Sequence, residues 1–301
     1  NEMARTKSKR RRSREDRIMD IIIYILSIII LFMTVYPFYY VFMLSFNEGI
    51  DASLGGIYWF PRKFTLSNYS RFFDDVKWLQ SLGVSVLRTL VGTSLGVAFT
   101  TLVAYALSFK DLVGRKAYMT FVIFCMYFSG GIIPYYTLLR TLHLIDTFAV
   151  YVIPGMLSLF YITIGRTFFE GIPSALRESA KIDGATELKV FTRIIVPISK
   201  PFMATLALFI GVGHWNNWYD STFFVKTKSL RTLPYLMMEI VHQFQTSSST
   251  NMNAAAHQTS GTTSLSIQLA AMVVSVVPII FIYPFLQKYF VTGMMVGAVK
   301  E

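Results

Sequence analysis

Long uncharged apolar runs separated by short polar segments are the main pattern along the chain. A helix needs about 20 such residues to cross a hydrocarbon core about 30 Å thick, because each residue adds about 1.5 Å. The pattern predicts an all-α integral membrane protein with six transmembrane helices. The expected spans cover residues 21–46, 81–109, 117–139, 147–168, 201–224 and 265–288.

The segments between and beyond these spans are too short to form separate soluble domains. We therefore expect one transmembrane domain over 21–293, preceded by a basic arm at 1–20 and followed by a tail at 294–301. Residues 245–264 are uncharged, polar and low in complexity, which predicts a mobile outer loop with a short helix at 252–257.

The composition narrows the class of protein further. Hydrophobic residues make up 53% of the 301 positions and charged residues only 15%, against about 25% charged in a typical soluble domain. Aromatic residues reach 16%, which excludes intrinsic disorder. The single cysteine, Cys125, excludes a disulfide scaffold.

The net charge of +11 is concentrated on the side that we assign to the cytoplasm. With the N-terminus inside, the cytoplasmic segments hold 19 Lys and Arg and the outer segments hold 8, so both termini are expected in the cytoplasm. Eight of these cations lie in the arm at 1–20. A topological anchor is the simplest explanation of the arm; contact with anionic lipid and a nucleic-acid arm are the alternatives.

The loop at 170–200 is too polar to span the membrane and has a helix–glycine–helix pattern. Ser174 can cap a first helix over 174–183, Gly184 interrupts it, and a second helix is expected over 185–195. The exposed face is expected to carry Glu178, Lys181 and Asp183. The face packed on the bundle is expected to carry Ala175, Leu188, Phe191 and Ile195. A generic connector between two spans is the alternative explanation.

The spacing within this loop is similar to a known signature. Glu178-Ser179-Ala180, Asp183-Gly184-Ala185 and the run from Ile194 to Pro197 resemble the Glu-Ala-Ala motif of binding-protein-dependent ABC importer permeases. Ser179 and Val196 depart from that motif, and both are close in size to the residues they replace. The resemblance implies a type I ABC importer permease fold with cytoplasmic coupling helices.

The resemblance also implies partners and roles. Two cytoplasmic ABC ATPases would bind ATP and Mg²⁺, a second homologous permease would form the other half of the path, and an extracytoplasmic protein would deliver the sugar. Glu178 would pair with a basic residue of the ATPase, and Gly184 would form the turn between the coupling helices. The residues assigned to ATPase coupling are Glu178, Ser179, Ala180, Asp183, Gly184, Ala185 and Pro197.

Other segments resemble carbohydrate permeases related to the maltose transporter. Residues 55–62 and 64–69 look like their first outer loop, and 289–300 looks like their C-terminal tail, which reaches the ATPases. Residues 128–134 and 213–218 are similar to the branch that imports complex oligosaccharides. That branch implies a uronate-type substrate such as alginate fragments; polyols, glycerol phosphate and peptides are the alternatives.

The fifth span contains residues suited to a sugar pathway, because aromatic rings pack on sugar rings and amides bind hydroxyls. Interfacial aromatic anchoring explains the same rings equally well. For His214 we expect an interhelical hydrogen bond, and for Arg88 and Asp220 a place at the outer interface, although Arg88 would suit an acidic substrate. The candidate pathway residues are Trp215, Asn216, Asn217, Trp218, Tyr219 and Arg88.

Several other classes are disfavoured by what the sequence lacks. There is no phosphate-binding G-x-x-x-x-G-K-[ST] and no zinc-binding H-E-x-x-H motif, so we expect no enzymatic activity and no bound cofactor or metal. A channel or secondary transporter remains as an alternative, but its spans would usually contain more polar groups. The predicted location is the bacterial cytoplasmic membrane, with lipid and protein partners and no nucleic acid.

Overall fold

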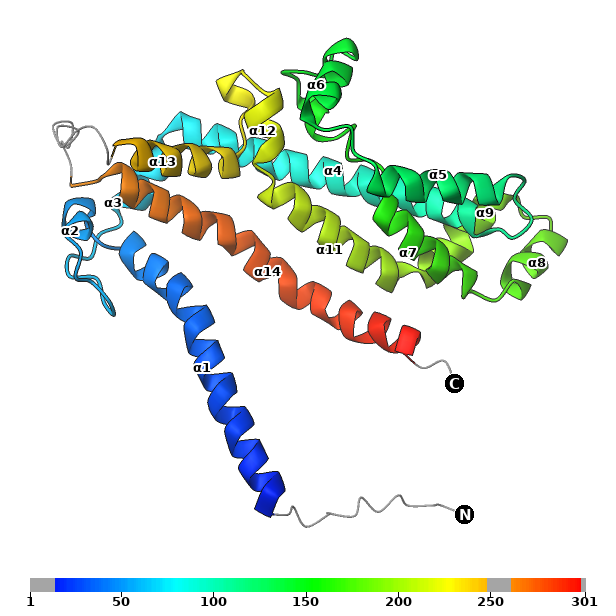
Figure 1. The fold of residues 1–301 in the computed structure, drawn as a ribbon, viewed down its shortest axis with the longest axis horizontal. Helices are drawn as coiled ribbons and strands as arrows, with labels where there is room; N and C mark the ends of the chain where they lie inside the picture. The colour runs from blue at the N-terminus through cyan, green and yellow to red at the C-terminus, as the bar shows by residue number, and fades with distance from the viewer. Residues whose placement is uncertain (1–13, 248–260, 299–301) are drawn as a thin grey trace. The chain divides into compact units, whose positions relative to one another are not determined.

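The computed structural model describes residues 14–247 and 261–298, and the helix expected at 252–257 lies outside them. The chain divides into two compact units, one formed by residues 1–68 and 258–273 and the other by residues 69–257 and 274–301. Within the described residues the regular secondary structure is helical, joined by loops, apart from an isolated bridge between Asn47 and Phe64 (Figure 1). The prediction of an all-α protein is confirmed for this part of the chain.

The first unit contains a long apolar helix and a small folded segment after it. Its core joins Leu44, Ala52, Ile57 and Leu269, so the end of the first helix, the loop after it and the start of the last helix pack together. The helix α14 begins here and continues into the second unit. The elements are α1 (Arg14–Ser45), α2 (Gly49–Ser53), the start of α3 (Ser67–Asp74) and the start of α14 (Ser264–Ala298).

The second unit is organised around α4 (Val76–Ser108), against which α7 and α11 pack along its length (Figure 1). Small residues permit this close approach: a Cβ added to Gly165 would lie 2.9 Å from Cβ of Ala104, and one added to Gly96 would lie 3.1 Å from Ile210. The shorter helices up to residue 190 are α5 (Arg115–Tyr127), α6 (Ile132–Thr141), η1 (Phe148–Tyr151), α7 (Leu159–Glu170), α8 (Ala175–Ile182) and α9 (Glu187–Val190). The later ones are η2 (Phe191–Ile195), α10 (Val196–Ile198), α11 (Lys200–Asn216), α12 (Tyr219–Phe224), η3 (Lys228–Leu230) and α13 (Leu233–Ser247).

Three helices are long and apolar enough to cross a membrane: α1, α4 and the Leu265–Ile282 part of α14. Two further spans result if each of two bent pairs is counted as one. The pair α5 and α6 bends by 116°, and the helical segment Glu187–Ile198 bends by 80° from α11. By this count the described residues contain three to five span candidates.

The expected third and fourth spans are not continuous helices. The third breaks between α5 and α6, where Gly131 adopts a left-handed φ of 83° that other residues resist. The fourth is helical only from Leu159, because residues 152–158 include Pro154 and Gly155 and form a loop after η1. Irregular backbone at membrane depth is tolerated where it is buried in protein or lines a cavity.

Candidate functional site

A buried ion pair joins α4 to the start of α12. The Arg88 side chain is 1% exposed and donates hydrogen bonds to the carboxylate of Asp220 and, at 3.0 Å, to the carbonyl of Asn217. Its guanidinium also lies 4.7 Å from the ring centre of Tyr151. A buried charge is tolerated when it is paired in this way. The Arg88 side chain is therefore buried in the protein rather than exposed at its surface, and its expected depth at the outer interface stays a prediction.

A cavity of about 410 Å³ lies beside this pair. The loop of 154–158 that interrupts the expected fourth span forms part of its wall. Its aromatic lining is Tyr135, Tyr151, Tyr161 and Phe209. Its polar lining is Arg88, Ser158, His214, Asn217 and Asp220. Aromatic faces combined with a few hydroxyl-binding groups suit the rings and hydroxyls of a sugar.

Of the six candidate pathway residues, the structure places two at this cavity, Arg88 and Asn217. The indole Nε1 of Trp215 instead donates to the Ser275 carbonyl on α14 at 2.9 Å, and Trp215 is 7% exposed. Because α11 ends at Asn216, Trp218 and Tyr219 do not continue the helix that carries Trp215. The other three candidate pathway residues are exposed and do not line the cavity; they are Asn216, Trp218 and Tyr219.

His214 fits against glycines rather than forming the expected interhelical hydrogen bond. A Cβ added to Gly92 would lie 2.5 Å from its Nε2, and one added to Gly155 would lie 3.4 Å from its Cε1. No hydrogen bond from His214 is present within the described residues. The two glycines thus make room for the imidazole beside the cavity.

We expect Gly92→Ala to disturb this wall of the cavity. The new methyl group would force the His214 ring to move, and overpacking of this kind costs about 1–3 kcal/mol. Gly83→Ala on the same helix is the matched control, because nothing lies within 4 Å of a Cβ added there. Thermal unfolding of the detergent-purified variants measures the difference. Equal stability of the two variants would show that the His214 site is not tightly packed.

The second candidate site is the loop between α7 and α11. The predicted first helix is present as α8, and Gly184 follows it with a left-handed φ of 78°, which explains glycine at this position. Ser174 precedes α8 but forms no capping hydrogen bond through its side chain. The exposed coupling candidates are Glu178, Ser179, Asp183, Gly184 and Pro197, whereas Ala185 is half-buried and Ala180 is buried.

The packed face of this loop differs in part from the prediction. Ala180, Val190 and Ile195 join a core with Tyr105 and Phe169. Ile195 and Phe191 pack here as predicted, whereas Ala175 and Leu188 are exposed. On α8 it is Ala180 that is buried in this core.

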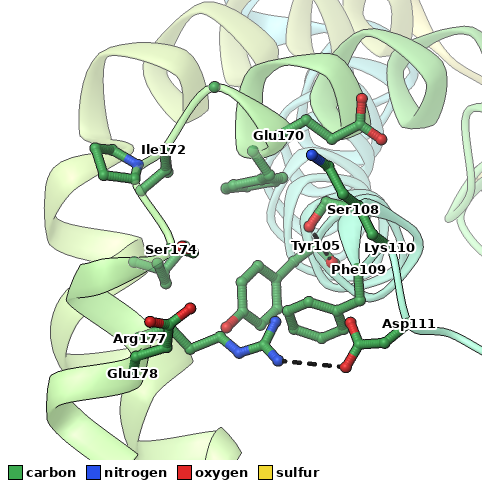
Figure 2. A pocket seen from close by; sticks show the side chains of 14 residues that line it. Tyr105, Ser108, Phe109, Lys110, Asp111, Glu170, Ile172, Ser174, Arg177 and Glu178 are labelled. Carbon is green, nitrogen blue, oxygen red and sulfur yellow. Dashed lines mark hydrogen bonds and ion pairs between the residues drawn. The ribbon is translucent and has the colours of Figure 1, made fainter.

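A charged and aromatic network holds α8 against the end of α4; Figure 2 shows the part formed by Arg177, Asp111, Tyr105 and Phe109. Arg177 lies 3.6 Å from a carboxylate oxygen of Glu187 and 3.8 Å from one of Asp111, and its guanidinium stacks 4.0 Å from the Phe109 ring. Tyr105 donates to Glu187 at 3.0 Å and Lys181 pairs with it at 2.7 Å. A pocket of about 600 Å³ lies beside this network and is lined in part by Tyr105, Phe109, Asp111 and Arg177.

The pKa of Glu187 reflects this environment. Burial by itself raises the pKa of this carboxyl, but hydrogen bonds from Lys181 and Tyr105 and the charge of Arg177 outweigh it and hold the pKa below its usual 4.5. A lowered pKa means that the network is fully formed above pH 4.5 and is lost as the pH falls through the lowered value. The link between α8 and α4 is therefore intact at neutral pH.

Comparison with known proteins gives consistent relatives over nearly the whole chain, although no family model matches. Protein LplC of Bacillus subtilis is 37% identical over 89% of this chain and 90% of its own length. The polygalacturonan/rhamnogalacturonan transport system permease protein YtcP of the same organism is 33% identical over 95% of this chain and 99% of its own length. A chain from the crystal structure of a bacterial ABC transporter involved in the import of the acidic polysaccharide alginate is 29% identical, with a TM-score of 0.84, over 92% of this chain and 98% of that chain.

Proposed function

Because the chain belongs to the family of sugar ABC transporter permeases, we propose that it is one permease subunit of a binding-protein-dependent oligosaccharide importer. It would form half of the translocation path, and a second homologous permease would form the other half. The observation that carries the proposal is the cavity beside Arg88 and Asp220, with its aromatic and hydroxyl-binding lining. An extracytoplasmic sugar-binding protein would deliver the substrate.

The proposed placement is in the bacterial cytoplasmic membrane with six spans and both termini in the cytoplasm. The bias of Lys and Arg supports this orientation. The bent pair of α5 and α6, the short α7 and α11 would supply the spans beyond the three long apolar helices. Together the spans would form one transmembrane domain over 21–293, with lipid covering its outer surface.

The loop at 170–200 would couple this domain to the ATPases. Its exposed residues, Glu178 and Asp183, are available to a partner, while Arg177 and Glu187 fasten α8 to α4. ATP and Mg²⁺ would bind to two partner subunits, and this chain would have no catalytic activity of its own. Rigid-body motion of the ATPases would then move α8 and α4 together.

The substrate class that we propose is acidic, uronate-type oligosaccharide such as alginate fragments. Two relatives are named for transport of polygalacturonan/rhamnogalacturonan and for import of alginate, which supports this class. Arg88 is already paired with Asp220, so the cavity in this chain would bind ring faces and hydroxyls. The carboxylates would be bound by another part of the transporter.

We expect Tyr161→Ala to reduce uptake of radiolabelled uronate oligosaccharides by about two- to tenfold, since loss of one aromatic–ring contact costs about 0.5–1.5 kcal/mol. Tyr161 lines the cavity, whereas its neighbour Phe160 does not and is 56% exposed. Phe160→Ala is therefore the matched control and should retain uptake. Proteoliposomes containing the purified transporter provide the measurement.

Competition with unlabelled alginate, polygalacturonate and neutral oligosaccharides in the same assay identifies the substrate. Strong competition by the acidic sugars alone supports the proposed class. Normal uptake by Tyr161→Ala would show that the sugar passes elsewhere. Competition by neutral oligosaccharides only would contradict the acidic substrate.

A further inference from the structure

The loop after α1 carries exposed aromatic side chains that the proposed function does not use. Residues 54–61 have no charged side chain. Three consecutive residues at its tip are exposed, Tyr58 at 61%, Trp59 at 54% and Phe60 at 76%. Large apolar side chains gathered in this way indicate a surface that is covered in the working protein.

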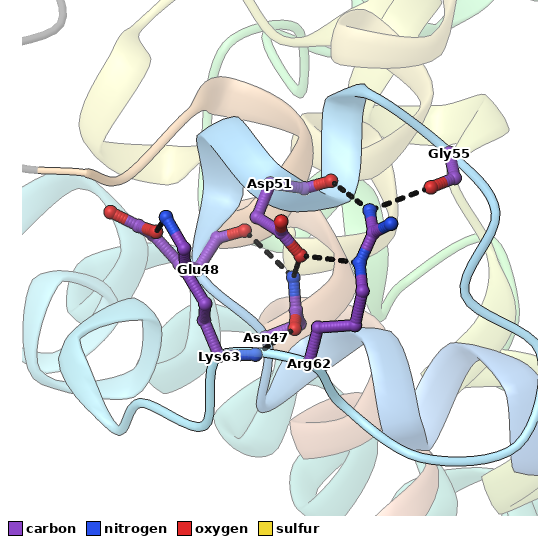
Figure 3. A network of polar contacts seen from close by, with 6 residues as sticks. All are labelled: Asn47, Glu48, Asp51, Gly55, Arg62 and Lys63. Carbon is purple, nitrogen blue, oxygen red and sulfur yellow. Dashed lines mark hydrogen bonds and ion pairs between the residues drawn. The ribbon is translucent and has the colours of Figure 1, made fainter.

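The charged residues of this loop are confined to its base (Figure 3). Arg62 donates to the Asp51 carboxylate at 3.1 Å and to the Gly55 carbonyl at 2.8 Å. Lys63 pairs with Glu48 at 2.8 Å, and its carbonyl accepts from the Glu48 amide at 2.9 Å. The base is therefore fixed, and the uncharged tip projects from it in one defined position.

The tip lies alongside α1 rather than beyond its end. The Trp59 ring centre is 5.6 Å from that of Tyr36, 6.2 Å from Phe32 and 6.5 Å from Tyr39. These three residues precede Ser45, the last residue of α1, by about 9 to 20 Å along the axis at about 1.5 Å per residue. Trp59 thus lies well below the outer end of the helix.

The depth of Trp59 follows from the length of α1 that lipid can cover. The uncharged run begins at Ile21, directly after Asp20. A hydrocarbon core of about 30 Å takes about 20 helical residues, which places its outer boundary near Tyr40. Trp59 therefore contacts α1 at or below that boundary, where the surroundings of an exposed side chain are lipid.

The backbone of the tip is adapted to such surroundings. Tyr39 donates its hydroxyl to the Trp59 carbonyl at 2.5 Å, and Tyr36 donates to the Tyr58 carbonyl at 3.5 Å. In water these carbonyls would need no protein partner. In lipid an unpaired carbonyl costs several kcal/mol, so irregular backbone requires such partners.

We propose that Tyr58, Trp59 and Phe60 insert into the outer leaflet and anchor the first outer loop to the lipid. The occupant of this surface is the boundary between acyl chains and headgroups, where tryptophan and tyrosine are favoured. The inference rests on α1 spanning the membrane and does not depend on the proposed substrate.

Fluorescence of Trp59 tests the proposal. The full-length chain with Trp78→Phe, Trp215→Phe and Trp218→Phe retains Trp59 as its single tryptophan, since the chain has four. In phosphatidylcholine–phosphatidylglycerol vesicles we expect strong quenching by lipids brominated on the acyl chain and little by aqueous iodide. The reverse pattern would overturn the proposal, as would bromolipid quenching that disappears when the second permease or the sugar-binding protein is added.

Cysteine labelling provides a second test that keeps the native tryptophans. In a Cys125→Ser background, Phe60→Cys and Leu54→Cys compare two positions that are equally exposed in the chain, at 76% and 78%. We expect a membrane-impermeant maleimide to label Phe60→Cys about tenfold more slowly than Leu54→Cys, because the reactive thiolate requires water. Equal rates would place the tip in water and contradict lipid insertion.

Discussion

Replacement of Asp220 by asparagine is expected to destabilise the protein by about 3–5 kcal/mol, because it leaves the buried charge of Arg88 without its carboxylate. The Arg88 side chain is 1% exposed, and the Asp220 side chain is 22% exposed. The second hydrogen-bond acceptor of Arg88, the Asn217 carbonyl, carries no full charge. Thermal or denaturant unfolding of the detergent-purified protein measures the loss.

Two further variants separate the buried pair from ordinary surface electrostatics. Lys77 on the same helix pairs with Glu239 at 3.6 Å, but its side chain is 51% exposed, so Lys77→Ala should cost at most about 1 kcal/mol. The double variant Arg88→Met/Asp220→Leu removes both charges and should recover much of the stability. A loss from Asp220→Asn no larger than that from Lys77→Ala would contradict the account of a desolvated pair.

Charge reversal at Glu178 and loss of glycine at 184 are expected to abolish transport while leaving the protein folded. Glu178 is exposed, and the resemblance assigns it to an ion pair with the ATPase. Gly184 has a φ of 78°, which a β-branched side chain resists by about 1 kcal/mol or more. Glu178→Lys and Gly184→Val should therefore weaken or misalign the docking of α8.

The measurement is ATP hydrolysis by the reconstituted complex with and without sugar-loaded binding protein. We expect both variants to lose the stimulation. Gly184→Asn is the matched control, since asparagine tolerates left-handed backbone better than valine, and it should keep most of the activity. Full stimulation in Glu178→Lys and Gly184→Val would mean that the loop is only a connector.

The features predicted well from sequence are those with a local physical cause. Uncharged apolar runs predicted α1, α4 and α14, since only a continuous helix satisfies its backbone in lipid. The helix α8 and its glycine turn were also predicted, because Gly184 is a local signal for a left-handed residue. Such features need no knowledge of distant contacts.

The features missed depend on contacts between distant segments. Burial of Arg88 requires Asp220, 132 residues later in the chain, so the sequence alone did not predict it. Trp215 and Trp218 were both selected for the sugar pathway, but α11 ends at Asn216 and separates them. Tyr161 and Phe209 were not selected, because they lie on different helices and only the fold brings them to the same cavity.

We propose that this chain transports oligosaccharide only as part of an ATP-driven complex. Uptake of labelled uronate oligosaccharide into proteoliposomes tests it most directly, with the chain reconstituted alone, with its second permease, and with the ATPases and binding protein. We expect uptake only in the complete complex supplied with ATP and Mg²⁺. Uptake by the chain alone, driven by an ion gradient and independent of ATP, would contradict it.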